Sequence, residues 1–394
     1  MLVLNTICMA GFMALFASVS IFTVAKADAN PKYIISDLGI INHVGSSATA
    51  INDQGEVIGT LGVGDSEEFS PQANHSFYWD KTLAHDMGRS YALSGINNQE
   101  QIVGLKYHSD YDLSDEQSLL AVSPVLYQDN QWISLLPKGA NSGFPIAIND
   151  SGLVAGQLHL ASSPLNKLTP AVWSKTDLHL LGVPASYISG IVKGMNNQGQ
   201  AVGYLQKISS PPSSYDKFAV LWNNTEVTLL GSLPGGSQSQ AVTINNRGHI
   251  LCQSTSNWEN FQKHMLELYE GKKNAKKQSL IFGGFLSDQG KLIAMVDPNE
   301  VVPGIDLSKG YNPRAMNDHD SVVGSASDSH GDPVAFIWED NKMIDLNTLL
   351  PQNSGWRLTD AKGINNKGQI VGKGQIMVNG KYSGRTHAFL LSPT

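Results

Sequence analysis

Cysteine is nearly absent from this chain of 394 residues, which contains only Cys8 and Cys252. The sequence has no Cys-x-x-Cys pair and no Cys/His cluster, which excludes a thiolate-bound structural zinc. Cys8 lies in the apolar N-terminal segment, so Cys252 is the single cysteine of the remainder. Without an internal disulfide, the fold must be stabilised by a buried core and by strand pairing.

Positive charge and catalytic signatures are also scarce. Charged residues make up only 15% of the chain and the net charge is −7, which argues against nucleic acid as a main partner. The chain has no Gly-x-Ser-x-Gly elbow, no His-Glu-x-x-His motif and no phosphate-binding loop. The sequence therefore predicts no metal and no cofactor, and it leaves any catalytic residues unknown.

Only the N-terminus carries a long apolar run. Residues 2–25 have no charged side chain and precede Lys26-Ala27-Asp28-Ala29, an Ala-x-Ala cleavage pattern. This predicts a signal peptide over residues 1–29, an exported mature domain over residues 30–394, and no membrane span after cleavage. The alternative is an uncleaved anchor helix, because the run is long enough to cross a bilayer.

A short pattern recurs with a period of about 45–50 residues. Residues 50–59 (AINDQGEVIG) and 363–372 (GINNKGQIVG) are close copies. Between them the Asn recurs at Asn97, Asn149, Asn196, Asn245 and Asn317, and a weaker copy has Ser287 in that slot. Asn-Asp/Asn-x-Gly is turn chemistry, and the flanking aliphatic residues favour strands, so each copy predicts a tight hairpin. A small residue seven positions after the Asn allows close backbone approach.

A second signature follows each hairpin after a variable insertion. It ends in an aromatic or aliphatic residue, as in Ser76-Phe77-Tyr78-Trp79 and Ala335-Phe336-Ile337-Trp338, and recurs at residues 124–127, 170–173, 219–222, 266–269 and 388–391. A further strand often comes next, as at residues 343–346, which gives four strands per unit. Four short strands at this period are typical of β-propeller blades. The Trp slot (Trp79, Trp173, Trp222, Trp338) predicts packing within or between blades.

The chain ends predict how the ring closes. The last unit stops after its third strand, and residues 33–38 resemble a fourth strand, so the N-terminus should complete the last blade and remove exposed edges. We therefore expect an all-β fold, a β-propeller of seven or eight four-stranded blades closed by the N-terminal strand. Eight is favoured, with the Ser287 unit as a degenerate blade. The alternative is an insertion within a seven-bladed ring.

These motifs resemble the bacterial extracellular HAF-repeat family. Its His-Ala-Phe motif is intact at His387-Ala388-Phe389 and relaxed at residues 75–77 and 334–336, while Asp37-Leu38-Gly39 also matches. The resemblance covers the whole mature chain and implies an extracellular repeat protein without assigning an activity. Because most units have lost the His, a functional role for His at this position is doubtful.

Candidate binding residues are expected in the loops between the second and third strands, since these vary in length while the hairpins do not. The loops span residues 61–74, 106–123, 157–169, 205–217 and 253–263 and should emerge on one face. The second loop combines aromatic faces with carboxylates, and its predicted ligand-binding residues are Tyr107, His108, Asp110, Tyr111 and Asp112.

Two functions lead at this point, and a purely structural surface protein is the third alternative. The favoured one is an exported binding module for a glycan, a peptide or a partner protein. The alternative is an extracellular polysaccharide hydrolase or lyase with carboxylates gathered at the central channel, where different blades contribute residues that sequence spacing does not reveal.

Overall fold

The computed structural model describes residues 31–39, 45–62, 75–108, 121–164, 167–208, 215–232, 237–255, 282–288, 291–295, 301–378 and 381–394. Within these ranges the regular secondary structure is β-strand, apart from two short 3-10 helices, η3 (Leu307–Lys309) and η4 (Leu346–Leu349). No helix in the described ranges is long and apolar enough to span a membrane.

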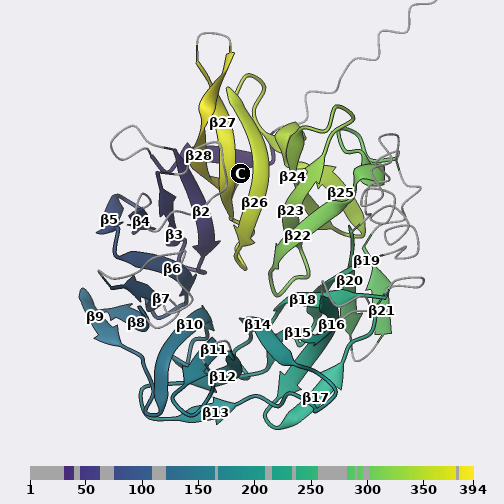
Figure 1. Ribbon diagram of the computed structural model, residues 1–394. Helices are drawn as coiled ribbons and strands as arrows, with labels where there is room; N and C mark the ends of the chain where they lie inside the picture. The colour runs from purple at the N-terminus through teal and green to yellow at the C-terminus, as the bar shows by residue number, and fades with distance from the viewer. Residues whose placement is uncertain are drawn as a thin grey trace, which may run out of the picture. The chain divides into compact units, whose positions relative to one another are not determined.

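The strands pair into seven antiparallel four-stranded sheets, which follow one another around a common centre in Figure 1. The first three blades are β2 (Ser46–Ile51), β3 (Val57–Leu61), β4 (His75–Trp79), β5 (Ala84–Gly88); β6 (Tyr91–Ile96), β7 (Ile102–Tyr107), β8 (Val122–Gln128), β9 (Gln131–Ser134); and β10 (Ala140–Ile148), β11 (Val154–Leu160), β12 (Thr169–Trp173), β13 (Leu178–Leu180). The fourth and fifth are β14 (Ser189–Met195), β15 (Ala201–Ile208), β16 (Tyr215–Asn223), β17 (Glu226–Leu229); and β18 (Ser239–Ile244), β19 (Ile250–Thr255), β20 (Phe282–Asp288), β21 (Lys291–Ala294). The sixth and seventh are β22 (Tyr311–Met316), β23 (Val322–Ser327), β24 (Pro333–Glu339), β25 (Lys342–Asp345); and β26 (Trp356–Ile364), β27 (Ile370–Val378), β28 (Lys381–Pro393) with β1 (Tyr33–Asp37).

The N-terminal strand completes the last blade, as the sequence predicts. β1 pairs antiparallel with β28, from Tyr33 opposite Pro393 to Asp37 opposite Phe389. The edge of β28 is thereby covered, and the two ends of the described chain are held in one sheet.

The expectation of eight blades is wrong. The weak copy at Ser287 is not a first-to-second-strand hairpin: Ser287 lies in β20, the third strand of the fifth blade, which pairs with the fourth strand β21. Asn, Asp and Gly favour a turn at any hairpin of a blade. The same sequence pattern can therefore occur both after the first strand and after the third. The aromatic signature expected at residues 266–269 lies outside the described residues, and β20 supplies the third strand instead.

The repeated Asn builds a closed ring of hydrogen bonds. In each blade the Asn side-chain nitrogen donates to the backbone oxygen of the equivalent Asn in the next blade, through Asn52, Asn97, Asn149, Asn196, Asn245, Asn317, Asn365 and back to Asn52. The next residue makes a second ring, in which its side-chain Oδ1 accepts from the backbone amide in the preceding blade, through Asp53, Asn98, Asp150, Asn197, Asn246, Asp318 and Asn366. These turns therefore form the structural inner rim of the propeller.

Close backbone approach explains the small residue seven positions after the Asn. A β-carbon on Gly203 would lie 1.9 Å from the carbonyl oxygen of Ile191, which is far inside van der Waals contact. The inner strand shifts register beside this point, between Val192 and Gly194, and the same shift recurs in all seven inner strands. Such a bulge bends each strand and increases its local twist.

The core lies between neighbouring blades and uses the third-strand aromatics. Trp173 and Trp222 are fully buried and Trp338 is nearly so. Their indole nitrogens donate to backbone oxygens that precede the inner strand of each blade: Leu135, Gly182 and Met295. The predicted packing role of these three Trp is confirmed.

Candidate ligand-binding cavity between the sixth and seventh blades

The structure describes two of the five predicted ligand-binding residues. Tyr107 ends β7, where its amide donates to the carbonyl oxygen of Ser90, and His108 Nε2 lies 2.9 Å from Ser123 Oγ. Asp110, Tyr111 and Asp112 lie outside the described residues. Tyr107 and His108 line neither of the two cavities below, so their binding role stays a prediction.

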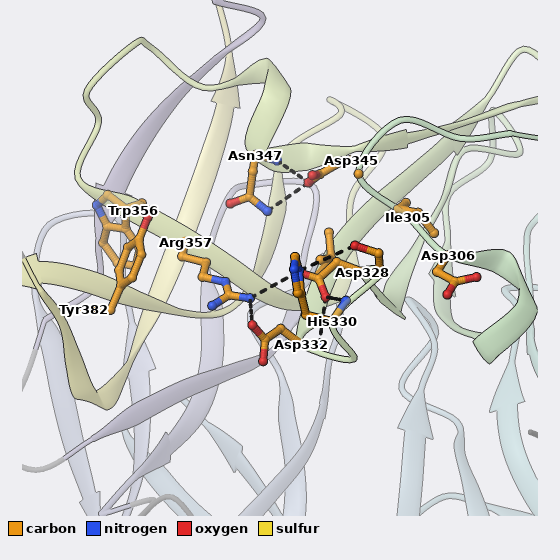
Figure 2. A pocket seen from close by; sticks show the side chains of 13 residues that line it. Ile305, Asp306, Asp328, His330, Asp332, Asp345, Asn347, Trp356, Arg357 and Tyr382 are labelled. Atoms are coloured by element: carbon orange, nitrogen blue, oxygen red, sulfur yellow. Dashed lines mark hydrogen bonds and ion pairs between the residues drawn. The ribbon is translucent and has the colours of Figure 1, made fainter. Parts of the chain in front are cut away.

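A cavity of about 750 Å³ lies instead between the sixth and seventh blades (Figure 2). Its walls come from the segment before η3, the loop joining β23 to β24, the end of β25 with the start of η4, the start of β26, and β28. Its size is within the range of small-molecule sites. The loop between the second and third strands of the sixth blade forms part of the wall. The cavity therefore lies at the end of the blade where these strands end and the loop begins.

Three carboxylates of this cavity are held by local hydrogen bonds and nearby cations. Asp306 Oδ1 accepts from the Ser308 hydroxyl at 2.5 Å and from its amide at 3.1 Å, and the hydroxyl bond is the main cause of the lowered pKa of Asp306. The pKa of Asp328 is lowered mainly by the Asp332 amide, which donates to it at 3.0 Å. Arg357 lies 3.0 Å from Asp332 Oδ2 and 3.7 Å from Asp328 Oδ2 and joins the two. The lowered pKa values keep Asp306 and Asp328 charged at neutral pH, and these contacts hold the three carboxylates in position.

Asp345 differs from the other three. Burial raises the pKa of its carboxyl, against the opposing effect of hydrogen bonds from the Asn347 backbone and side-chain amides at 2.8 and 2.9 Å. The backbone at Gly304 passes so close that a β-carbon there would lie 2.8 Å from Asp345 Oδ2. Within the described residues Asp345 has no ion pair, and the charge of the more distant Arg357 offsets the effect of burial on its pKa only in part.

Two aromatic rings complete the walls. Trp356 packs edge-on against His387 and Phe389, with ring centroids 6.0 and 6.4 Å away, which fixes the indole in place. Tyr382 is 44% exposed and offers its ring to solvent. Carboxylates, one Arg and exposed aromatic surface together suit a ligand with several hydroxyl groups and an apolar ring face.

Sequence reasoning missed this cavity because its loop, between β23 and β24, is short. The prediction concentrated on long insertions, whereas the site forms by apposition of two blades. The available signal was Asp345, which follows the sixth third-strand signature just as Asp86 follows the first.

A second, smaller cavity of about 170 Å³ lies at the rim of the Asn ring. Its three carboxylates, Asp53, Asp150 and Asp318, each accept from a backbone amide and from neighbouring Asn side chains at 2.7–3.2 Å. Such carboxylates are parts of turns. Among the residues described, no group of three His, Cys, Asp or Glu side chains is arranged to hold a metal ion.

Residues 237–393 match the model of a family described as a protein of unknown function, DUF3466. No match was found among curated proteins. Among solved structures, the chain is similar to the β-propeller domain of the Trilobed protease from Pyrococcus furiosus, with 12% identity, a TM-score of 0.53, and coverage of 88% of this chain and 95% of that one. The acylaminoacyl peptidase of Pyrococcus horikoshii matches with 10% identity and a TM-score of 0.49 over 86% of this chain and 52% of that chain. At 12% identity, the likeness to the Pyrococcus furiosus domain shows the β-propeller fold alone.

Proposed function

We propose that this protein is an exported binding module that recognises a glycan in the cavity between its sixth and seventh blades. The observation that carries the proposal is the combination of Trp356 and Tyr382 with the fixed carboxylates Asp306 and Asp328 in one open cavity. Sugar rings present hydroxyls that carboxylates accept from and C–H faces that pack on aromatic rings. The peptide and protein alternatives fit less well, because the walls offer many separate polar groups rather than a continuous apolar groove.

Export is part of the proposal and rests on the N-terminal sequence alone. The apolar run and Ala-x-Ala pattern before residue 30 support it. The proposed relationship to extracellular HAF repeats rests on the motif at residues 387–389, whose His387 Nδ1 lies 3.2 Å from Oδ2 of Asp37.

The alternative of a polysaccharide hydrolase or lyase with carboxylates at the central channel has less support. At the rim of the Asn ring, the carboxylates of Asp53, Asp150 and Asp318 accept from the backbone amides of Asn366, Asn98 and Asn246 in neighbouring turns. A carboxylate held in this way has little freedom to transfer a proton.

A glycan array with purified residues 30–394 tests the proposal, followed by affinity measurements on Trp356→Ala. Trp132→Ala is the matched control, because Trp132 is another half-buried indole, stacked on Tyr91 in the second blade with ring centroids 4.0 Å apart. We expect Trp356→Ala to weaken binding about tenfold and Trp132→Ala to leave it unchanged. An array without hits, or equal losses in both variants, would contradict the proposal.

A further inference from the structure

Two blades contain a His–Asp pair at equivalent positions of the repeat. In the first blade, His75 Nδ1 lies 2.8 Å from both carboxylate oxygens of Asp86. In the seventh, His387 Nδ1 lies 3.2 Å from Asp37 Oδ2. Strand register makes the positions equivalent, because Asp86 lies opposite Phe77, Asp37 lies opposite Phe389, and each His precedes its Phe by two residues. In both blades the fourth-strand carboxylate thus binds an imidazole from the third strand.

The sixth blade keeps the carboxylate and lacks the imidazole. Asp345 lies opposite Phe336 in the same register, and the residue two positions before Phe336 is Val334. Asp345 and Val334 both line the cavity between the sixth and seventh blades. The space next to Asp345 that an imidazole fills in the other two blades is therefore part of this cavity.

The charged groups around Asp345 do not replace the missing His. Arg357, from the neighbouring blade, is 3.0 Å from Asp332 and 3.7 Å from Asp328. Lys309 is 3.6 Å from Asp306, and His330 is 4.0 Å from Asp328. Each other carboxylate of the cavity has a basic group within ion-pair distance, whereas Asp345 has none among the described residues. Four carboxylates against Arg357 and His330 leave the lining with an excess of negative charge.

We propose that the cavity binds a glycan carrying a free amino group, whose ammonium takes the place beside Asp345 that the His imidazole occupies in the first and seventh blades. This inference rests on the proposed function and adds the ligand's chemical class to it. An ammonium donates charge-assisted hydrogen bonds to the carboxylate, and the sugar ring lies against Trp356 and Tyr382. A neutral sugar leaves the Asp345 carboxylate desolvated without a cation, which disfavours it.

Two trimers of matched size test the inference: β-1,4-linked glucosamine, which carries the amine, and β-1,4-linked glucose, which has a hydroxyl in its place. Calorimetry on the full mature chain should give about 10- to 100-fold tighter binding of the amine. Asp345→Asn retains the acceptor for Asn347 and should remove the preference. Val334→His should also remove it, by supplying an internal imidazole to Asp345, while Val334→Leu should retain it.

The outcomes separate this inference from the proposed function. Equal binding of both trimers, weakened equally by Trp356→Ala, would overturn the amine while keeping the glycan site. An amine preference that survives in Asp345→Asn would overturn the role of Asp345. If Val334→His fails to fold, Asp345→Asn still decides. Binding of neither trimer would overturn the amino-glycan inference, and the glycan array then decides the proposed function separately.

Discussion

Asn365 donates from its side-chain nitrogen to the carbonyl oxygen of Asn52 at 2.9 Å, across 313 positions of the sequence. This contact joins the seventh blade to the first on the inner rim, while β1 joins the same blade to the N-terminus on the outer edge. The ring is thus closed in two ways. One is a hydrogen bond that recurs between each pair of neighbouring blades, and the other is β1, which completes the sheet of the seventh blade.

Replacing one Asn of the ring should destabilise the whole propeller. Asn97 is buried; its nitrogen donates to the Asn149 carbonyl oxygen at 2.9 Å, and its oxygen accepts from the Gln99 and Gln101 amides at 3.0 and 2.9 Å. Asn97→Ala leaves these groups without a partner, so we expect a loss of about 3 kcal/mol in the free energy of unfolding in urea. Gln54→Ala, which removes an exposed amide from the same kind of turn, should change it by less than about 0.5 kcal/mol. Similar effects of both would show that the ring is not a stabilising unit.

Two substitutions at the small-residue position should differ strongly in how much they lower the free energy of unfolding. Gly203→Ala places a β-carbon 1.9 Å from the Ile191 carbonyl oxygen, so β14 must move. We expect a loss of at least about 3 kcal/mol in the free energy of unfolding, or failure to fold. Cys252→Ala, in the same slot of the fifth blade, removes only a sulfur and should cost about 1 kcal/mol. Thermal unfolding of the two variants compares them, and a mild Gly203→Ala would refute the close-approach explanation.

Ionisation of Tyr33 should destabilise the protein in alkali. Burial, and then the charge of Glu339, raise the pKa of this phenol to about 12 from its usual 10. The unfolded state then loses the proton first, so the stabilisation is complete below pH 10 and is lost as pH rises to about 12. The effect is at most about 2–3 kcal/mol. Tyr33→Phe should flatten the alkaline limb of the urea-midpoint profile, whereas the exposed Tyr382→Phe should not.

Ligand binding at Asp345 should depend on pH in the acid range. The pKa of Asp345 is raised by burial, so the carboxylate forms at a higher pH than for an ordinary Asp. Affinity for the glucosamine trimer should rise with pH through this raised pKa and fall again when the sugar amine loses its proton, because binding needs both the carboxylate and the ammonium. Without ligand, the free energy of unfolding should change with pH in the opposite direction. The contribution of Asp345 to stability is fully present below the ordinary pKa of Asp and is lost as pH rises through the raised pKa. A pH-independent affinity, or the same profile in Asp345→Asn, would refute the prediction.

Much of the blade could be predicted because its signals are local. The Asn-x-x-Gly turns demand a positive φ, and Glu100 and Asp320, which replace Gly in two turns, do adopt φ of 58° and 65°. The pairing of β1 with the last blade could also be predicted, because a third strand without a neighbour leaves an exposed sheet edge. The count of eight failed because Ser287 carries the same turn chemistry at a different hairpin.

The cavity could not be predicted in the same way, because its residues come from separate parts of two blades. Arg357 meets Asp328 and Asp332 only when the sixth and seventh blades pack together.

By itself, the sequence determined the all-β repeat, its hairpins, its small-residue slots and the strand that closes the ring, since each depends on neighbours a few residues away or on one pairing rule. Tertiary structure decided the number of blades and the surroundings of Asp345, because burial, lost partners and apposed charges are properties of packed blades rather than of one chain segment.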